Sequence, residues 1–196
     1  MKKILAYILC VAISGAMTSA AFAQSEHQGQ ELYQNGHYEK AIEHWEVAAA
    51  QGDSGAAYKL GETYYDGIVV ERDLKLSFKY IKQAADANDP RGLTDLAGLY
   101  DYGEIVREDK NKAAALYLAA AKQGYPSAMF NVAGMLEIGE GGLKKDKVEA
   151  YKYYLLSRDQ GFAPFAVKAL QDLEKNMTAK QLADAKDRAD NFFATH

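Results

Sequence analysis

An eight-residue stretch that returns twice along the chain decides the fold. It reads Leu-Gly-Glu-Thr-Tyr-Tyr-Asp-Gly at residues 60–67, Leu-Ala-Gly-Leu-Tyr-Asp-Tyr-Gly at 96–103 and Val-Ala-Gly-Met-Leu-Glu-Ile-Gly at 132–139. Each copy begins 36 residues after the one before it. A fixed period of this length is typical of proteins that stack one structural unit on the next.

A second pattern follows each copy of the first. A loop ends in an aspartate (Asp73, Asp109 or Asp146), and an alanine-rich segment comes next. In the segment at 113–124, small, aliphatic or aromatic residues sit at offsets 0, 3, 4, 7, 8 and 11, which is the apolar stripe of a helix. Related segments lie at 41–52, 77–88 and 150–161. Because the aspartates stand a repeat apart, we expect them to cap helices rather than to bind a metal.

The chain's three prolines mark the boundaries between units. Pro90, Pro126 and Pro164 each follow an alanine-rich segment, where a missing N–H and a fixed φ suit the start of a helix. Each unit therefore reads as helix A, loop, helix B and turn. The sequence predicts an all-α protein, a right-handed superhelical α/α solenoid with a C-terminal capping helix.

We expect the following division of the chain: a cleaved signal peptide at 1–23, a half-typical repeat at 24–53, full repeats at 54–89, 90–125 and 126–162, and a partial repeat with a capping helix at 163–196. Thr178 and Gln181 form a capping-box pattern at the start of the last helix. That helix is expected to turn Leu182, Ala185, Ala189 and Phe193 toward the last core face.

These motifs resemble the Sel1-like repeat family, which is related to the tetratricopeptide repeats. The Leu-Gly-x-x-Tyr of residues 60–64 is shared with tetratricopeptide repeats, but the 36-residue period and the Gly-x-x-x-x-x-Asp loop favour Sel1-like repeats. The resemblance covers roughly residues 28–162. It implies a solenoid that binds another protein and has no catalytic role.

The N-terminus predicts export from the cytoplasm. Lys2 and Lys3 precede an apolar run, and Ala21-Phe22-Ala23 has the small-x-small form of a cleavage site. The apolar run is shorter than the roughly 20 residues of a membrane-spanning helix. We therefore expect cleavage after Ala23, a periplasmic location, and no membrane span in the mature chain. The chain's one cysteine, Cys10, would leave with the signal.

Composition and motifs argue against several function classes. The formal net charge is −4, without the basic excess of a general nucleic-acid binder. One cysteine excludes a disulfide framework and a cysteine-rich zinc site. The chain contains no G-x-S-x-G elbow, no helical His pair with a carboxylate and no phosphate-binding loop. We therefore assign no catalytic, cofactor-binding or metal-binding residue, and an enzyme such as a cell-wall hydrolase is not favoured.

A partner is expected on the concave side of the solenoid, which the A helices usually line. The positions of helix A that point there are Lys59, Glu62, Tyr65, Asp66, Asp95, Asp101, Tyr102, Asn131 and Glu137. Tyrosines among acids suit a protein-binding surface, because tyrosine is a frequent interface anchor. The alternative is a solvated acidic face whose tyrosines pack sideways.

Two functions fit these observations. The first is a periplasmic scaffold or adaptor that holds a protein partner in the concave groove. The second is an immunity or inhibitor protein that neutralises a toxic effector, for example an antibacterial lipase, since an acidic surface suits a basic partner. The sequence does not separate the two.

Overall fold

The computed structural model describes residues 19–193, without the side chains of residues 19–24 and 163. Residues 1–18 of the predicted signal peptide lie outside this range. The first described helix, α2 (Ser19–Gln34), spans the predicted cleavage position. Cleavage after Ala23 stays a prediction.

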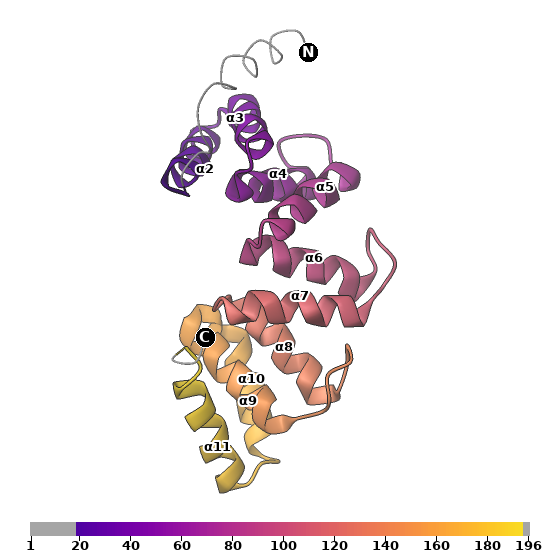
Figure 1. Ribbon diagram of the computed structural model, residues 1–196, viewed down its shortest axis with the longest axis vertical. Coiled ribbons are helices and arrows are strands. Elements are labelled where there is room, and N and C mark those ends of the chain that lie inside the picture. Colours follow the sequence, from indigo (N-terminus) through magenta and orange to yellow (C-terminus); the bar gives the residue numbers. More distant parts are fainter. Residues whose placement is uncertain (1–18, 194–196) are drawn as a thin grey trace.

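Helices stack in sequential pairs along the long axis of the molecule (Figure 1). Three repeats follow α2 and α3 (Tyr38–Ala50). Their A helices are α4 (Ser54–Asp66), α6 (Pro90–Tyr102) and α8 (Pro126–Ile138). Their B helices are α5 (Leu74–Asp86), α7 (Lys110–Lys122) and α9 (Lys147–Ser157). Over residues 19–193 the chain forms helices, turns and loops without a strand. The predicted all-α solenoid is confirmed. None of the described helices is both long and apolar enough to cross a bilayer.

The predicted caps define where the B helices begin. The side chain of Asp73 accepts hydrogen bonds from the backbone N–H groups of Lys75 and Leu76. Asp109 and Asp146 cap α7 and α9 in the same way. These bonds satisfy donors that have no partner within the helix. The expectation of capping aspartates is confirmed.

Each A helix ends in a left-handed glycine, and the loop after it is closed by a backbone hydrogen bond. Gly67 has φ 64° and Gly103 has φ 65°, a conformation that costs glycine little. The N–H of each capping aspartate then donates to a carbonyl near the end of helix A: Asp73 to Tyr64 (3.0 Å), Asp109 to Tyr100 (2.9 Å) and Asp146 to Leu136 (2.9 Å). This bond fixes helix B against helix A.

Small residues set the spacing between repeats. A Cβ on Gly92 of α6 would stand 2.7 Å from the backbone nitrogen of Ala85 on α5, so the two helices cross almost in backbone contact. Larger side chains fill the space beside these crossings, and Trp45 and Tyr117 are almost fully buried. Close approach of the helices keeps the layer of A helices firmly packed on the layer of B helices.

The C-terminus closes the solenoid with α10 (Ala163–Glu174) and α11 (Ala179–Asp190), reached through the wide turn η1 (Arg158–Phe162). The predicted capping box of Thr178 and Gln181 is present. The expectation for Phe193 was wrong: Phe193 is 49% exposed, and Phe192 is buried at 4%. Because α11 ends at Asp190, the chain turns before these residues, and the turn directs Phe192 inward.

Candidate protein-binding hollow

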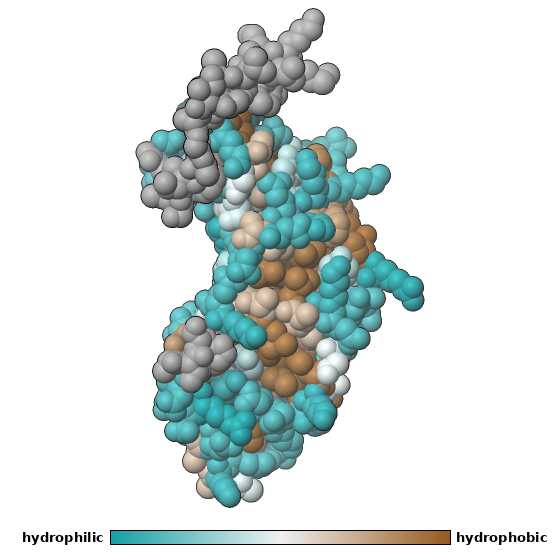
Figure 2. Space-filling model, viewed as in Figure 1, coloured by the Kyte–Doolittle hydropathy of each residue, from teal (hydrophilic) through white to brown (hydrophobic). Residues whose placement is uncertain are grey.

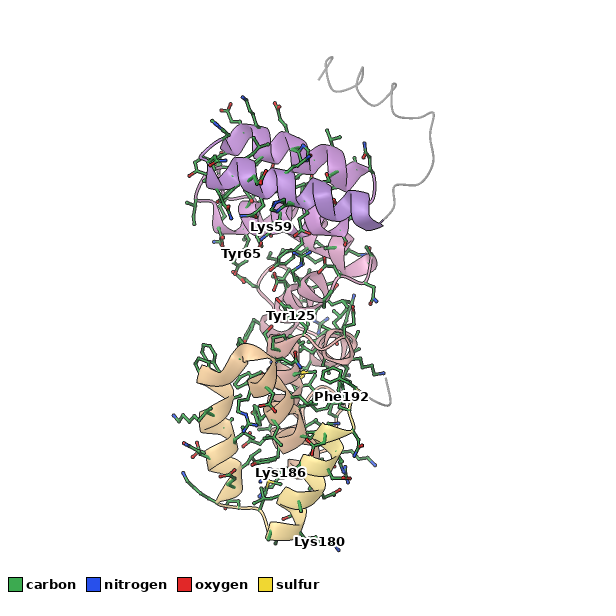
Figure 3. The ribbon with its side chains drawn as sticks, turned by 90° about the vertical axis from the view of Figure 1, so that its left-hand side faces the viewer. Lys59, Tyr65, Tyr125, Lys180, Lys186 and Phe192 are labelled. Carbon is green, nitrogen blue, oxygen red and sulfur yellow. The ribbon has the colours of Figure 1, made fainter. Side chains whose placement is uncertain are left out.

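The A helices enclose an open hollow of about 360 Å³ near the middle of the molecule. Its floor contains apolar atoms of Ile81, Leu99 and Tyr117. The other lining residues are Glu62, Tyr65 and Asp66 of α4, Thr94, Asp95, Gly98 and Tyr102 of α6, Glu104 of the following loop, and Asn131 of α8. Figure 3 shows the molecule narrowing here, with Lys59 and Tyr65 above the waist and Tyr125 beside it.

Asp95 is a carboxylate of the hollow whose ionisation is opposed by its surroundings. Burial, and then the negative charge of Glu62, raise the pKa of Asp95 to about 6. A hydrogen bond from the Tyr58 hydroxyl opposes this rise. The same hydroxyl donates to Glu62 Oε1 at 3.0 Å. Two carboxylates therefore share one hydroxyl donor, and a cation would relieve their repulsion.

The lining residues of the hollow include four carboxylates and no basic side chain. Lys59 stands at the edge, where its Nζ lies 2.9 Å from Glu62 Oε2. No basic side chain of the lining offsets the charge of Asp95, and the neighbouring Glu62 adds a second negative charge. The electrostatic field of the site therefore attracts positive charge.

Tyr65 is held at the rim by residues from two different loops. Its hydroxyl donates to Glu104 Oε2 at 2.8 Å, and Arg72 donates from Nε to the Tyr65 carbonyl at 2.8 Å. The Arg72 guanidinium also lies 5.1 Å from the centre of the tyrosine ring. The hydrogen bond to Glu104, followed by burial, raises the pKa of Tyr65. Tyr65 is thus a fixed wall of the hollow rather than a free side chain.

Tyr102 is the aromatic side chain that the hollow leaves open to solvent. It is 76% exposed. The equivalent position one repeat earlier is Asp66, and one repeat later it is Ile138, which is 64% exposed. A large apolar surface left in water at the rim of a cavity is typical of a binding surface.

The structure brings together six of the nine residues proposed from the sequence: Glu62, Tyr65, Asp66, Asp95, Tyr102 and Asn131 line the hollow. Two others are directed at B helices. Asp101 Oδ1 lies 2.8 Å from Lys110 Nζ, and Glu137 accepts a hydrogen bond from the Tyr154 hydroxyl at 3.2 Å. Lys59 is at the edge, as described above. That these residues bind a partner stays a prediction.

Sequence reasoning missed the floor of the hollow and one wall. Gly98 opens the space above the floor, where a Cβ would come 3.6 Å from the Tyr117 hydroxyl. The signal for this opening is the replacement of Glu62 by glycine one repeat later. Glu104 lies in a loop, and its contact with Tyr65 joins residues 39 positions apart. A pattern read along single helices does not detect such a contact.

The chemistry of the hollow suits recognition. Among residues 19–193, no group of three or more His, Cys, Asp or Glu side chains is arranged to hold a metal ion. The lining offers carboxylates, an exposed phenol and apolar atoms. This combination can bind a positively charged and partly apolar segment of another molecule.

Comparison with protein families gives one assignment over most of the chain. The family described as Sel1 repeat matches at residues 19–53, 54–89, 90–125 and 126–162. These four matches cover the helix pairs from α2 to the end of η1.

Two curated relatives carry the name exopolysaccharide production negative regulator. The one from Rhizobium leguminosarum bv. viciae is 31% identical over 79% of this chain and 63% of its own length. The one from Rhizobium meliloti is 32% identical over 69% of this chain and 55% of its own length. The chain thus spans less than two thirds of the relatives it matches.

Solved structures with the same fold include a Sel1 repeat protein from Oxalobacter formigenes. It has a TM-score of 0.67 and 24% identity, over 73% of this chain and 58% of that chain. A protective antigen present in uropathogenic Escherichia coli strains, which displays an SLR fold, has a TM-score of 0.57 and 20% identity, over 88% of this chain and 47% of that chain. At these identities the likeness concerns the fold alone.

Proposed function

Because the chain belongs to the Sel1 repeat family, we propose that it is a non-catalytic scaffold that binds a protein partner in the hollow between α4, α6 and α8. The observation that carries this proposal is the pairing of Asp95, a half-buried carboxylate beside Glu62 with no basic side chain in the lining, with the exposed ring of Tyr102. Both features lower stability or solubility in the free protein, and both become favourable when a partner covers them.

The proposed partner presents a basic segment. A lysine or arginine side chain that enters the hollow would meet Asp95 and Glu62 and would stack beside Tyr102. Binding would favour the ionised form of Asp95 and release the proton that its raised pKa retains below about pH 6. Attraction between exposed charges also predicts faster association at low salt.

The proposed role is regulatory, and the proposed location is the periplasm. The two relatives named as negative regulators support the first part, since a scaffold can restrain another protein by holding it. The signal-like sequence of residues 1–23 supports the second part. An alkaline phosphatase fusion at the C-terminus tests the location, because this enzyme needs disulfides that form only outside the cytosol. Activity in intact cells is expected, and a fusion protein that is present but inactive would contradict the proposed location.

Site-specific photocrosslinking tests the hollow as the binding site. A photoreactive phenylalanine analogue at position 102 should yield one major protein adduct in the native cells. The same analogue at Tyr38, which is 40% exposed and outside the hollow, serves as the control. Asp95→Lys should abolish the adduct at position 102. Adducts that form only from position 38, or that survive Asp95→Lys, would exclude the hollow.

The alternative of an immunity protein uses the same acidic hollow against a basic toxic effector. Deletion of the gene separates the two roles. Growth arrest that occurs only in cells exposed to the effector identifies an immunity protein. A deletion that changes a regulated product without any effector supports the scaffold.

A further inference from the structure

The outer side of α7 differs from that of the other B helices. We define the α7 outer face as Ala115, Leu116, Leu118 and Ala119, of which Ala115 is exposed and the other three are half-buried. The corresponding residues are Lys79, Tyr80, Lys82 and Gln83 on α5, and Glu43, His44, Glu46 and Val47 on α3. Those helices carry charge where α7 carries methyl groups.

The same positions are again rich in apolar groups on α9, on which α11 packs. The α9 residues are Lys152, Tyr153, Leu155 and Leu156, displaced by the one residue inserted in the preceding loop, and all four are buried. The Phe192 ring that follows α11 lies 5.8 Å from the Tyr153 ring. Arg188 Nη1 lies 2.6 Å from Glu149 Oε1. The molecule thus shows what covers such a face.

In the part of the chain that the structure describes, α7 packs mainly on α6 and α8. Figure 2 shows an apolar band on the viewed face that runs from the level of α6 past α7 to α8. The Phe193 ring stands close to Gly124, directly after α7, so the end of the cap borders the α7 outer face. A helix laid on α7 would therefore continue the layer that α11 begins.

We propose that the α7 outer face binds an amphipathic helix of a partner protein, with a carboxylate of that helix opposite Lys112. The cap shows which charge a helix packed on α7 needs at this point. On α9 the residue before the face is Glu149, which meets Arg188 of α11. On α7 the equivalent residue is Lys112, which is exposed and whose Nζ donates to the Tyr100 hydroxyl at 2.8 Å, so it is paired with a neutral group and not with a carboxylate there. The helix that fits α7 thus needs the opposite charge from that of α11 at this point.

The same charges argue against a second copy of the chain as the occupant. Two α7 helices packed antiparallel across this face would bring Lys112 of one copy against Lys122 of the other. Both lysines are exposed, and like charges facing each other oppose such a dimer. A partner helix with acids beside its apolar stripe meets no such repulsion.

A peptide derived from the cap provides the probe. It contains residues 178–193 with Arg188→Glu, and a lactam between the exposed side chains of Lys180 and Asp184 holds it helical. Fluorescence anisotropy measures its binding to the full chain. We expect saturable binding that Ala115→Glu weakens at least tenfold. Lys79→Glu, which places the same acid at the matching position of α5, should leave binding unchanged.

Charge reversal gives the second readout. The same peptide with the native Arg188 should bind at least tenfold more weakly to the wild-type chain, and Lys112→Glu should reverse this preference. Circular dichroism of each variant checks that the solenoid remains folded. If no saturable binding is seen up to about 1 mM peptide, the proposal is overturned, because the binding free energy would then be weaker than about −4 kcal/mol. Equal binding of the peptide to the wild-type chain and to Ala115→Glu would also overturn the proposal. A dimer of the full chain that Ala115→Glu dissociates would overturn it as well, because the face would then bind a second copy.

Discussion

The acidic hollow on the A helices and the cap of α9 and α11 both contain half-buried carboxylates, but two bases contact Glu149 in the cap, whereas the lining of the hollow has no base for Asp95. In the cap, hydrogen bonds from Lys152 and Arg188 outweigh the effect of burial and lower the pKa of Glu149. In the hollow, burial and the neighbouring Glu62 raise the pKa of Asp95 to about 6. Charge therefore stabilises the fold at the cap and destabilises it at the hollow, where a partner would supply the missing cation.

Removal of the cap's aromatic anchor should have the largest effect. Phe192→Ala empties a buried site against Tyr153 and should lower the free energy of unfolding by about 3 kcal/mol. Urea unfolding measures the change. Phe193→Ala is the matched control and should cost less than about 1 kcal/mol, because this ring is half-exposed. Equal losses would mean that the cap does not depend on Phe192.

Asp95→Asn should stabilise the free protein at neutral pH. The fold raises the pKa of Asp95 from 3.8 to about 6, so the folded state retains a proton that the unfolded state releases. The contribution of Asp95 to stability should therefore fall as pH rises from about 4 to about 7, by about 1 to 2 kcal/mol after allowance for solvent screening. The variant lacks this loss, so urea unfolding should show equal stabilities near pH 4 and a more stable variant at pH 7.

Glu149→Gln should show the opposite dependence on pH. The lowered pKa of Glu149 gives stability that is present above pH 4.5 and is lost as pH falls through the folded pKa. The variant should be about 1 kcal/mol less stable than the wild type at pH 7, and the difference should shrink toward pH 3. If the Asp95 and Glu149 variants followed the same trend, the contrast between hollow and cap would be lost.

Tyr65→Phe should have the smallest effect. It removes the hydrogen bond to Glu104 at the rim, which is worth about 0.5 to 1 kcal/mol. Tyr102→Phe is the control, with no expected change, because its ring is 76% exposed to water. Comparison of the two unfolding midpoints in urea checks this prediction. A larger loss from Tyr102→Phe would show that Tyr102 supports the fold.

Much of the fold could be predicted from the sequence because its signals are local. Glycine, proline and the capping aspartates fix where helices begin and end through backbone conformation alone. Phe192 and Phe193 were exchanged because the last helix stops at Asp190. The apolar periodicity of the sequence continues past Asp190, but the helix does not.

The site was less accessible to sequence reasoning because its contacts cross repeats. Comparison of equivalent positions in successive repeats predicted that Asp95 and Tyr102 lie on the concave side, where the hollow is found. They did not show that Asp101 would meet Lys110 or that Glu137 would meet Tyr154. Those pairs depend on side-chain direction across two helices, which spacing along one helix leaves open.

The backbone bond that closes each A/B loop has a consequence for protein engineering. The third loop carries one extra residue, yet Asp146 still donates to Leu136 at 2.9 Å, as Asp73 and Asp109 do to their own carbonyls. The backbone hydrogen bond at the base of the loop thus forms even when the loop is one residue longer. In the first repeat the tip includes Ile68, which is 79% exposed. A short epitope or a fluorophore tag grafted after Ile68 would report on the protein in living cells while the stacked helices keep their register.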